Sequence, residues 1–200
     1  MQLHERSGTL HAQLRSQTSD LHAAVETVSD LPGSVVTIAD YGVLLSTFHA
    51  AHGQLEGQLE SPRWSTSWDT LGVDVASHRQ LHLLEHDLEA LGLAAASPTT
   101  GDPLVATPEQ ALGCLYVIQG SSLGRRALFP LLEDTLGNIP AAFFGGARAQ
   151  LHQWQAVTKA LGLVGEDAAR RDDVVMGARL AFSVFLAHLN CRTPASTVRR

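Results

Sequence analysis

A histidine in the stretch TSDLHAAVE has neighbours that suit a metal ligand. His22 is preceded one helical turn earlier by Thr18 and followed one turn later by Glu26. On a helix Glu26 can accept a hydrogen bond from one imidazole nitrogen and fix the tautomer that leaves the other nitrogen free for a metal. A single histidine on a half-apolar helix is also a common hydrogen-bonded core residue, so the spacing alone leaves both interpretations open.

Arg15 adds a charge to the same helix face. It lies seven residues before His22, which is roughly 10 Å along a helix axis. That distance suits an acidic group at the edge of a flat ligand whose metal sits over His22. A cation is needed there because burying such an acidic group unpaired is costly.

Two glycines in the stretch GSSLG point to a second functional surface. Gly120 and Gly124 lie one turn apart within a predicted helix, where each costs about 1 kcal/mol relative to alanine. Without a Cβ atom, a flat ligand can lie directly on the backbone, and the helix can bend. Close packing against another helix or a simple kink is the commoner reason for such glycines, so this pattern also has two interpretations.

The elements that must position these residues are helices. Apolar residues recur at intervals of three and four, and clusters of Pro, Gly, Ser and Thr separate the periodic segments. The predicted helices cover approximately residues 10–28, 37–59, 78–92, 107–129, 147–161 and 167–190. No segment alternates convincingly with period two, so the sequence predicts an all-α fold, with one domain over residues 1–200.

Local signals define several helix ends. Thr37 with Asp40 makes a capping box, and TPEQ places Thr107 at an N-cap with a proline at the first helical position. Gly92 suits the residue just past a helix end. Pro130 is expected to disturb the fourth helix after Phe129.

Composition excludes several classes of protein. Apolar residues make up 44% and charged residues 17%, which is typical of a soluble globular chain. The net charge of −6 argues against a nucleic-acid partner, and the apolar runs are too short to cross a membrane. Cys114 and Cys191 form no CxxC motif, which fits a reducing compartment, so we expect a cytoplasmic protein.

Two further groups invite a metal site: His78, His82 and His86, and, on the second predicted helix, His49, His52 and Glu56. Histidines at intervals of four drift by about 40° per step, and the first group spans roughly 12 Å, so its members cannot all bind one ion. We interpret these histidines as surface or half-buried residues of amphipathic helices. A di-iron bundle would need paired Glu-x-x-His motifs, which the chain lacks.

Two stretches together resemble the haem oxygenase family. LRSQTSDLHAAVE is similar to its proximal helix, where a basic residue, a threonine, the iron-binding histidine and a glutamate match Arg15, Thr18, His22 and Glu26. YVIQGSSLGRRAL resembles its glycine-rich distal helix, in the GS-x-LG form of bacterial enzymes found with bacteriophytochromes. HDLEALG, IPAAFFGG with a tryptophan following, and ARLAF resemble family segments more weakly.

The resemblance implies a single all-α domain with haem b between the first helix and a kinked distal helix. His22 would bind the iron, and the distal segment containing Gly120, Ser121 and Gly124 would direct the chemistry. Other residues implied to surround the haem or orient its ligand are Arg15, Thr18, Glu26, Tyr116 and Arg179, of which Arg15 and Arg179 would meet its propionates.

The activity implied is the opening of haem by O2 and reducing equivalents to biliverdin, carbon monoxide and ferrous iron. The chain has no nucleotide or flavin fingerprint, so a ferredoxin or reductase would be the external electron donor, and a bacteriophytochrome would be a receiver of biliverdin. Two alternatives remain: a non-catalytic haem-binding or haem-sensing protein on the same scaffold, and a helical protein that binds no haem, with His22 in its core.

Two positions depart from the family pattern. Ser121 stands where many members have an aspartate, which we expect to alter the water network without removing activity. Arg125 stands where a second glycine is common. From the sequence, its side chain can reach a propionate, point outward to a reductase or narrow the pocket.

Overall fold

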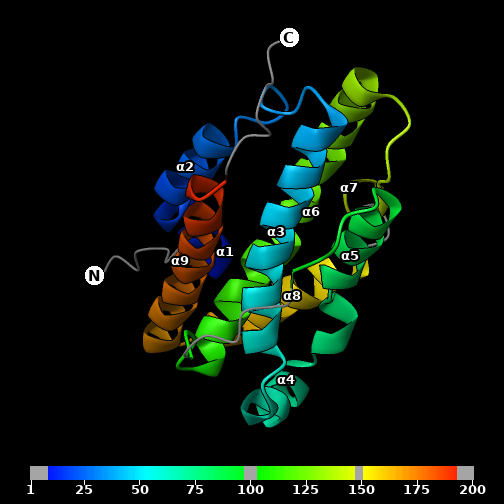
Figure 1. The fold of residues 1–200 in the computed structure, drawn as a ribbon. Helices are drawn as coiled ribbons and strands as arrows, with labels where there is room; N and C mark the ends of the chain where they lie inside the picture. The colour runs from blue at the N-terminus through cyan, green and yellow to red at the C-terminus, as the bar shows by residue number, and fades with distance from the viewer. Residues whose placement is uncertain (1–8, 97–102, 147–150, 193–200) are drawn as a thin grey trace.

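The computed structural model describes residues 9–96, 103–146 and 151–192 (Figure 1). These residues form helices and no strand, so the predicted all-α fold is confirmed. The elements in chain order are α1 (Leu10–Gln17), α2 (Ser19–Ser29), α3 (Ile38–Leu59), η1 (Pro62–Trp64), α4 (Ser65–Leu71), η2 (Val75–His78), α5 (Leu81–Ala90), α6 (Pro108–Leu136), α7 (Ala142–Gly145), α8 (Leu151–Val164) and α9 (Ala168–Asn190).

The first predicted helix is in fact two helices. Thr18 interrupts it: this buried residue has φ −119° and ψ 2°, and its hydroxyl donates to the carbonyl of Leu14 at 2.8 Å. Such side-chain bonds to the preceding turn compete with regular helix geometry and often bend it. Arg15 and His22 therefore lie on different helices, and the expectation of one continuous helix face was wrong.

The capping signals were read correctly. The capping box at Thr37 forms, with its hydroxyl accepting from the amide of Asp40 at 3.1 Å. Thr107 caps α6 in the same way by accepting from the amide of Gln110 at 3.1 Å. Gly92 follows α5 with φ +70°, a conformation that glycine adopts without strain.

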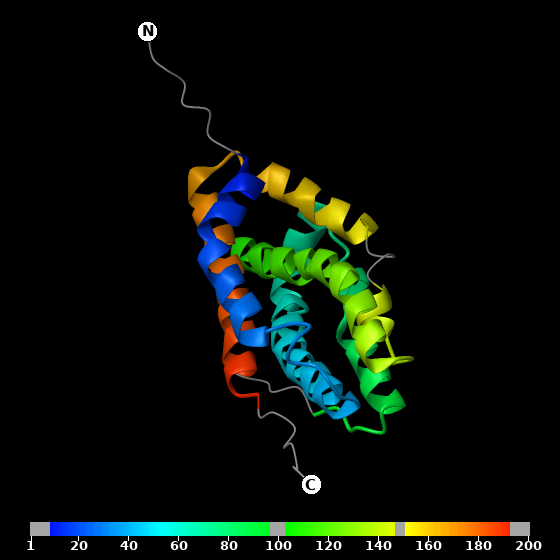
Figure 2. The same ribbon diagram turned by 90° about the horizontal axis from the view of Figure 1, so that it is seen from above.

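Pro130 does not end the fourth helix, because α6 continues through it to Leu136. Figure 2 shows that α6 changes direction between its green first part and its yellow-green last part. Pro130 cannot donate to the preceding turn, and glycine weakens a helix locally, so Gly120, Gly124 and Pro130 account for a bend in this region. The predicted kinked helix is thus present, and it is longer than expected.

α6 and α9 form the main helix pair of the molecule. α2 packs along α9, α8 packs on α6, and α3 lies against α5 and α9, while the short α7 sits between α5 and α6 (Figures 1 and 2). One apolar core fills the space among α1, α3, α6, α8 and α9. A second one joins α3, α5 and α7 to the last turns of α6.

Glycine permits the close approach of α6 to α9. A Cβ atom on Gly113 would lie 2.0 Å from the carbonyl oxygen of Val174, and one on Gly177 would lie 2.0 Å from the carbonyl oxygen of Gln110. Backbone therefore meets backbone at this crossing, and no side chain fits between the two helices there.

In the described part of the chain, none of the helices combines the length and apolar character that a membrane crossing requires.

Candidate functional site

His22 lies on the surface of α2 with its imidazole oriented by two neighbours. Its side chain is 60% exposed, and Nδ1 is 3.5 Å from Oε1 of Glu26. The ring meets Phe182 of α9 edge to face, with centroids 5.8 Å apart. Nδ1 is thus the ring nitrogen that faces Glu26, as the spacing of the two residues predicts, and the role of Nε2 as a ligand atom stays a prediction.

Gly120 and Gly124 leave the backbone of α6 bare. A Cβ atom on Gly120 would make an ordinary contact, 3.6 Å, with the ring of Trp154. No atom from another part of the described chain lies within 4 Å of a Cβ atom built on Gly124. Close helix packing therefore explains Gly113, about three turns before Gly124, and it does not explain Gly124.

Ser121 lies between these two glycines and is half-buried. Its hydroxyl donates to the carbonyl of Ile118 at 2.7 Å, so in this rotamer it does not donate to a ligand. The oxygen keeps a lone pair with which it can accept a hydrogen bond from water or ligand.

Tyr116 joins α6 to α1 and α8. Its buried ring lies 5.8 Å from the ring of His11 and 5.6 Å from that of Trp154. Burial raises the pKa of Tyr116, and the positive charge of Arg15 opposes that shift. Arg15 is thus close enough to act electrostatically on a residue one turn before Gly120.

Arg179 already has partners on the neighbouring helix. Its guanidinium donates to both carboxylate oxygens of Asp20 at 3.0 Å and to the carbonyl of Gln17. The hydrogen bonds from Arg179 lower the pKa of Asp20. These contacts join α9 to the junction of α1 and α2, next to the buried Thr18.

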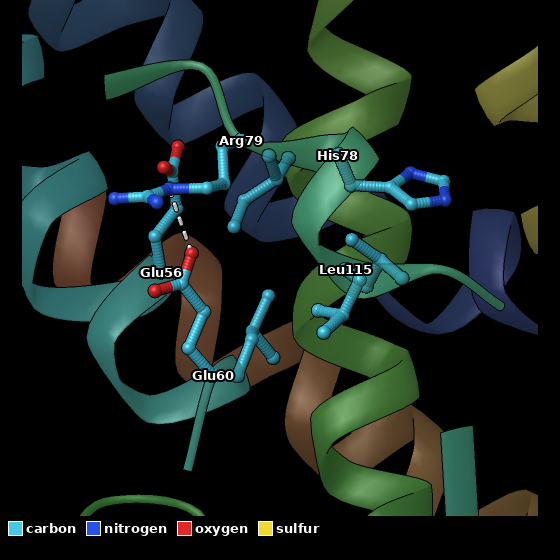
Figure 3. Close-up of a pocket in the computed structure, with 8 residues that line it drawn as sticks. Glu56, Glu60, His78, Arg79 and Leu115 are labelled. Carbon is cyan, nitrogen blue, oxygen red and sulfur yellow. Dashed lines mark ion pairs between the residues drawn. The ribbon is translucent and has the colours of Figure 1, made fainter. Parts of the chain in front are cut away.

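Two pockets among the described residues have linings that include neither His22 nor Gly124. One, of about 10 Å³, is lined by Glu56 and His78 and lies beside the ion pair of Arg79 with Glu60, whose Nε and Oε1 atoms are 2.8 Å apart (Figure 3). That volume suits about one water molecule. The other, of about 480 Å³, is a shallow groove that includes Arg179 and Gln17. A flat ligand of porphyrin size does not fit the first.

The largest correction concerns the histidines of α3. His49 and His52 are not surface residues, because both are buried, as is His78 at the end of η2; His82 and His86 are exposed, as expected. His52 Nδ1 lies 2.9 Å from Oε1 of Glu56. Oε1 also accepts from the amide of Gln80 at 3.0 Å, and Oε2 accepts from the amide of Leu81 at 3.2 Å. The carboxylate of Glu56 thus caps the start of α5.

The pKa shifts show how this buried cluster is ionised. Burial lowers the pKa of His52, although the hydrogen bond to Glu56 opposes the shift. Burial raises the pKa of Glu56, but the bonds from His52, Leu81 and Gln80 outweigh it, and the net pKa is lowered. The pair is therefore a neutral imidazole that donates to a carboxylate. Within the described residues, no set of three or more His, Cys, Asp or Glu side chains is arranged to hold a metal.

Arg125 also belongs to this interior. It is 4% exposed, and its guanidinium donates to the carbonyl of Phe143 and to Oε1 of Gln80. It does not point outward, and these partners place it among α5, α6 and α7. The three alternatives read from the sequence are thus replaced by an interior role, which the sequence did not indicate because both partners are distant along the chain.

Comparisons with known proteins give a likeness at the level of structure. No family model matches the chain, and no curated protein matches it. Among solved structures, the fold is similar to the NO- and CO-bound heme oxygenase from Neisseria meningitidis, with a TM-score of 0.74 over 96% of this chain and 95% of that one. The two sequences are 19% identical, so the likeness establishes the all-helical fold shared with that protein.

Proposed function

We propose that the protein is a haem oxygenase that opens haem to biliverdin, carbon monoxide and ferrous iron. Haem would lie between α2 and the middle of α6, at Gly120–Gly124, with His22 as the iron ligand. The shared fold with a heme oxygenase over nearly the whole of both chains supports this reaction class.

The observation that carries the proposal is the contrast between the glycines of α6. Gly113 is required where α6 touches α9, whereas Gly124 faces no other part of the described chain. A helix glycine that costs about 1 kcal/mol and has no packing role needs another reason, and a flat ligand resting on the bare backbone supplies one. His22, exposed and paired with Glu26, would provide the opposite side of the site.

Each residue then has a distinct task. Glu26, whose Oε1 lies 3.5 Å from Nδ1 of His22, would accept from that nitrogen and make Nε2 the better ligand atom. Gly120 and Gly124 let the distal helix approach the ring and restrict where O2 can react, while the oxygen of Ser121 accepts a hydrogen bond from ordered water. When bound, haem supplies the iron that activates O2 and is itself the molecule oxidised.

Basic residues would hold the acidic edge of the haem. Arg15 is exposed on α1 and would be the first candidate to pair with a propionate. Arg179 can contribute only if it shares its guanidinium with Asp20 or leaves it. Tyr116 closes the α1 side of the site together with His11, and Thr18 acts through the bend between α1 and α2.

Electrons and product transfer require partners. We propose a ferredoxin or a reductase as the external donor and, for enzymes of this bacteriophytochrome-associated type, a bacteriophytochrome as one receiver of biliverdin. We propose that the protein is cytoplasmic, binds haem, and has no nucleic-acid or membrane partner.

Haemin titration tests the proposal at its first step. The wild-type protein should give a Soret band typical of histidine ligation, and His22→Ala should lose it, with His82→Ala as a control because His82 is exposed on α5. If wild-type protein produces no Soret shift, haem is not its ligand. If His22→Ala binds haemin as wild type does, the assignment of the iron ligand is wrong.

Turnover separates the enzyme from a carrier on the same scaffold. With O2 and a ferredoxin and reductase system, the haem complex should lose its Soret band and form biliverdin. A non-catalytic haem-binding or haem-sensing protein would keep its haem spectrum under the same conditions.

A further inference from the structure

Arg125 immediately follows the bare segment of α6, and its side chain is turned into the protein interior. Gly124 is exposed, whereas Arg125 is buried. Its two terminal nitrogens donate to the carbonyl of Phe143 at 2.7 Å and to Oε1 of Gln80 at 2.6 Å. Its guanidinium carbon lies 3.9 Å from the centroid of the Phe143 ring. One side chain thus joins α6 to α7 and to the residue that precedes α5.

The cluster behind Arg125 balances its charge. Burial lowers the pKa of Arg125 to about 9, and the negative charge of Glu56 opposes that shift. Gln80 connects the two, because its side chain accepts from Arg125 and its amide donates to Glu56. A buried cation is costly unless it is paired and hydrogen-bonded, so this position needs the whole arrangement around it.

The neighbouring part of α6 has little else to fix it. Gly120 makes one side-chain contact, Gly124 makes none with other parts of the described chain, and Pro130 lacks the amide that would bond to the preceding turn. The helix bends in this region (Figure 2). Arg125 lies between the glycines and the proline, where a rigid fork of donors limits rotation of the helix about its axis.

Building on the proposed function, we infer that Arg125 is a positioning residue that sets the rotation of α6 and thereby the presentation of Gly120–Gly124 to the haem. Successive helix residues are about 100° apart around the axis, so a small rotation at Arg125 moves the adjacent bare backbone with it. Arg125 touches no ligand in this account. It acts through the helix, and its effect on haem is on orientation more than on affinity.

The first test uses the protein without haem. Amide hydrogen exchange is compared at residues 120–124 in Arg125→Gln, in Arg126→Gln, whose side chain is the exposed neighbour, and in Leu71→Ala, which opens a core cavity on α4. All are measured at the same interval below their own melting temperatures. We expect exchange in this segment to be about tenfold faster in Arg125→Gln than in either control. Equal rates in Arg125→Gln and Leu71→Ala would overturn the inference.

The second test uses the haem complex. Arg125→Gln should keep the Soret band that depends on His22 but change the ratio of biliverdin isomers and slow turnover by about 10- to 100-fold. Arg125→Lys, which keeps the charge but not the fork, should restore turnover only in part. Wild-type isomer ratio and turnover in Arg125→Gln would overturn the inference even if exchange were faster.

The two tests separate this inference from the proposed function. If the wild-type protein binds no haemin, the haem oxygenase proposal fails. The exchange comparison then still decides whether Arg125 fixes the bare segment of α6.

Discussion

The first and second halves of α6 use glycine for opposite reasons. At Gly113 the backbone of α6 meets the backbone of α9, and even a methyl group would overlap Val174. At Gly124 the backbone faces no other part of the described chain. The same residue type therefore permits helix packing in one half and keeps a surface open in the other. The comparison shows that a glycine indicates a binding surface only when its packing role has been excluded.

The largest expected effect comes from the packed half. Gly113→Ala should destabilise the protein by about 3 kcal/mol or more. The new Cβ atom would lie 2.0 Å from the carbonyl oxygen of Val174, so helices α6 and α9 would have to move apart. Urea denaturation of the variant measures this loss. A change below about 1 kcal/mol would show that the two helices separate without cost.

The open half should behave in the opposite way. Gly124→Ala should stabilise the protein without haem by about 0.5 to 1 kcal/mol, because alanine is the better helix former and meets no neighbour. The same variant should lower haem turnover by about tenfold or more, since a methyl group displaces the ring from its reacting position. Melting curves measure the expected gain in stability, and biliverdin assays measure the expected loss of turnover. A destabilised variant with normal turnover would show that Gly124 serves helix packing and not ligand binding.

The sequence predicted what depends on neighbours along the chain. The capping residues Thr37 and Thr107 act within one turn, so their roles are visible in the sequence. The pair of His22 with Glu26 is equally local, and it forms as expected. The requirement for Gly113 was missed because its partner, Val174, is 61 residues away in sequence.

Buried polar groups were missed for the same reason. Periodicity could not show that His52 is buried, because its partner Glu56 is in turn held by the amides of Gln80 and Leu81 at the start of α5, and Phe143 of α7 packs against its ring. Arg125 was read as a surface or pocket cation, since its acceptors, Gln80 and the carbonyl of Phe143, are brought to it only by the fold. Thr18 is a different case, because its partner is local: its hydroxyl donates to the carbonyl of Leu14, and the sequence pattern does not show that this bond interrupts the helix.

The buried His52 should make the stability of the protein depend on pH. His52 has a lowered pKa in the folded protein and titrates near its ordinary value of 6.5 when unfolded, so the unfolded state binds more protons on acidification. Stability should therefore be complete above about pH 6.5 and fall below it, by at most about 1.4 kcal/mol per pH unit for this group.

His52→Gln should flatten that part of the profile. Urea denaturation between pH 7.5 and pH 5, at intervals of about half a unit, measures the slope in wild type and variant. His78, whose pKa burial also lowers, should keep a remaining slope in the variant. Identical slopes in the two proteins would mean that folding does not shift the pKa of His52.

The smallest effect should come from Ser121. Its hydroxyl donates within the helix, so Ser121→Ala should leave stability nearly unchanged while slowing turnover by about two- to fivefold through the loss of one acceptor for water. Single-turnover measurements on the haem complex suit this comparison, with Ser122→Ala as the neighbouring variant. Unchanged turnover in Ser121→Ala would remove this residue from the site.

A crystal structure of the ferric haem complex tests the central claim most directly. The account predicts a bond from the iron to Nε2 of His22, with the porphyrin lying against the backbone of Gly120–Gly124. Iron bound to another histidine, such as His11 on α1, or a ring that leaves Gly124 uncovered would contradict it.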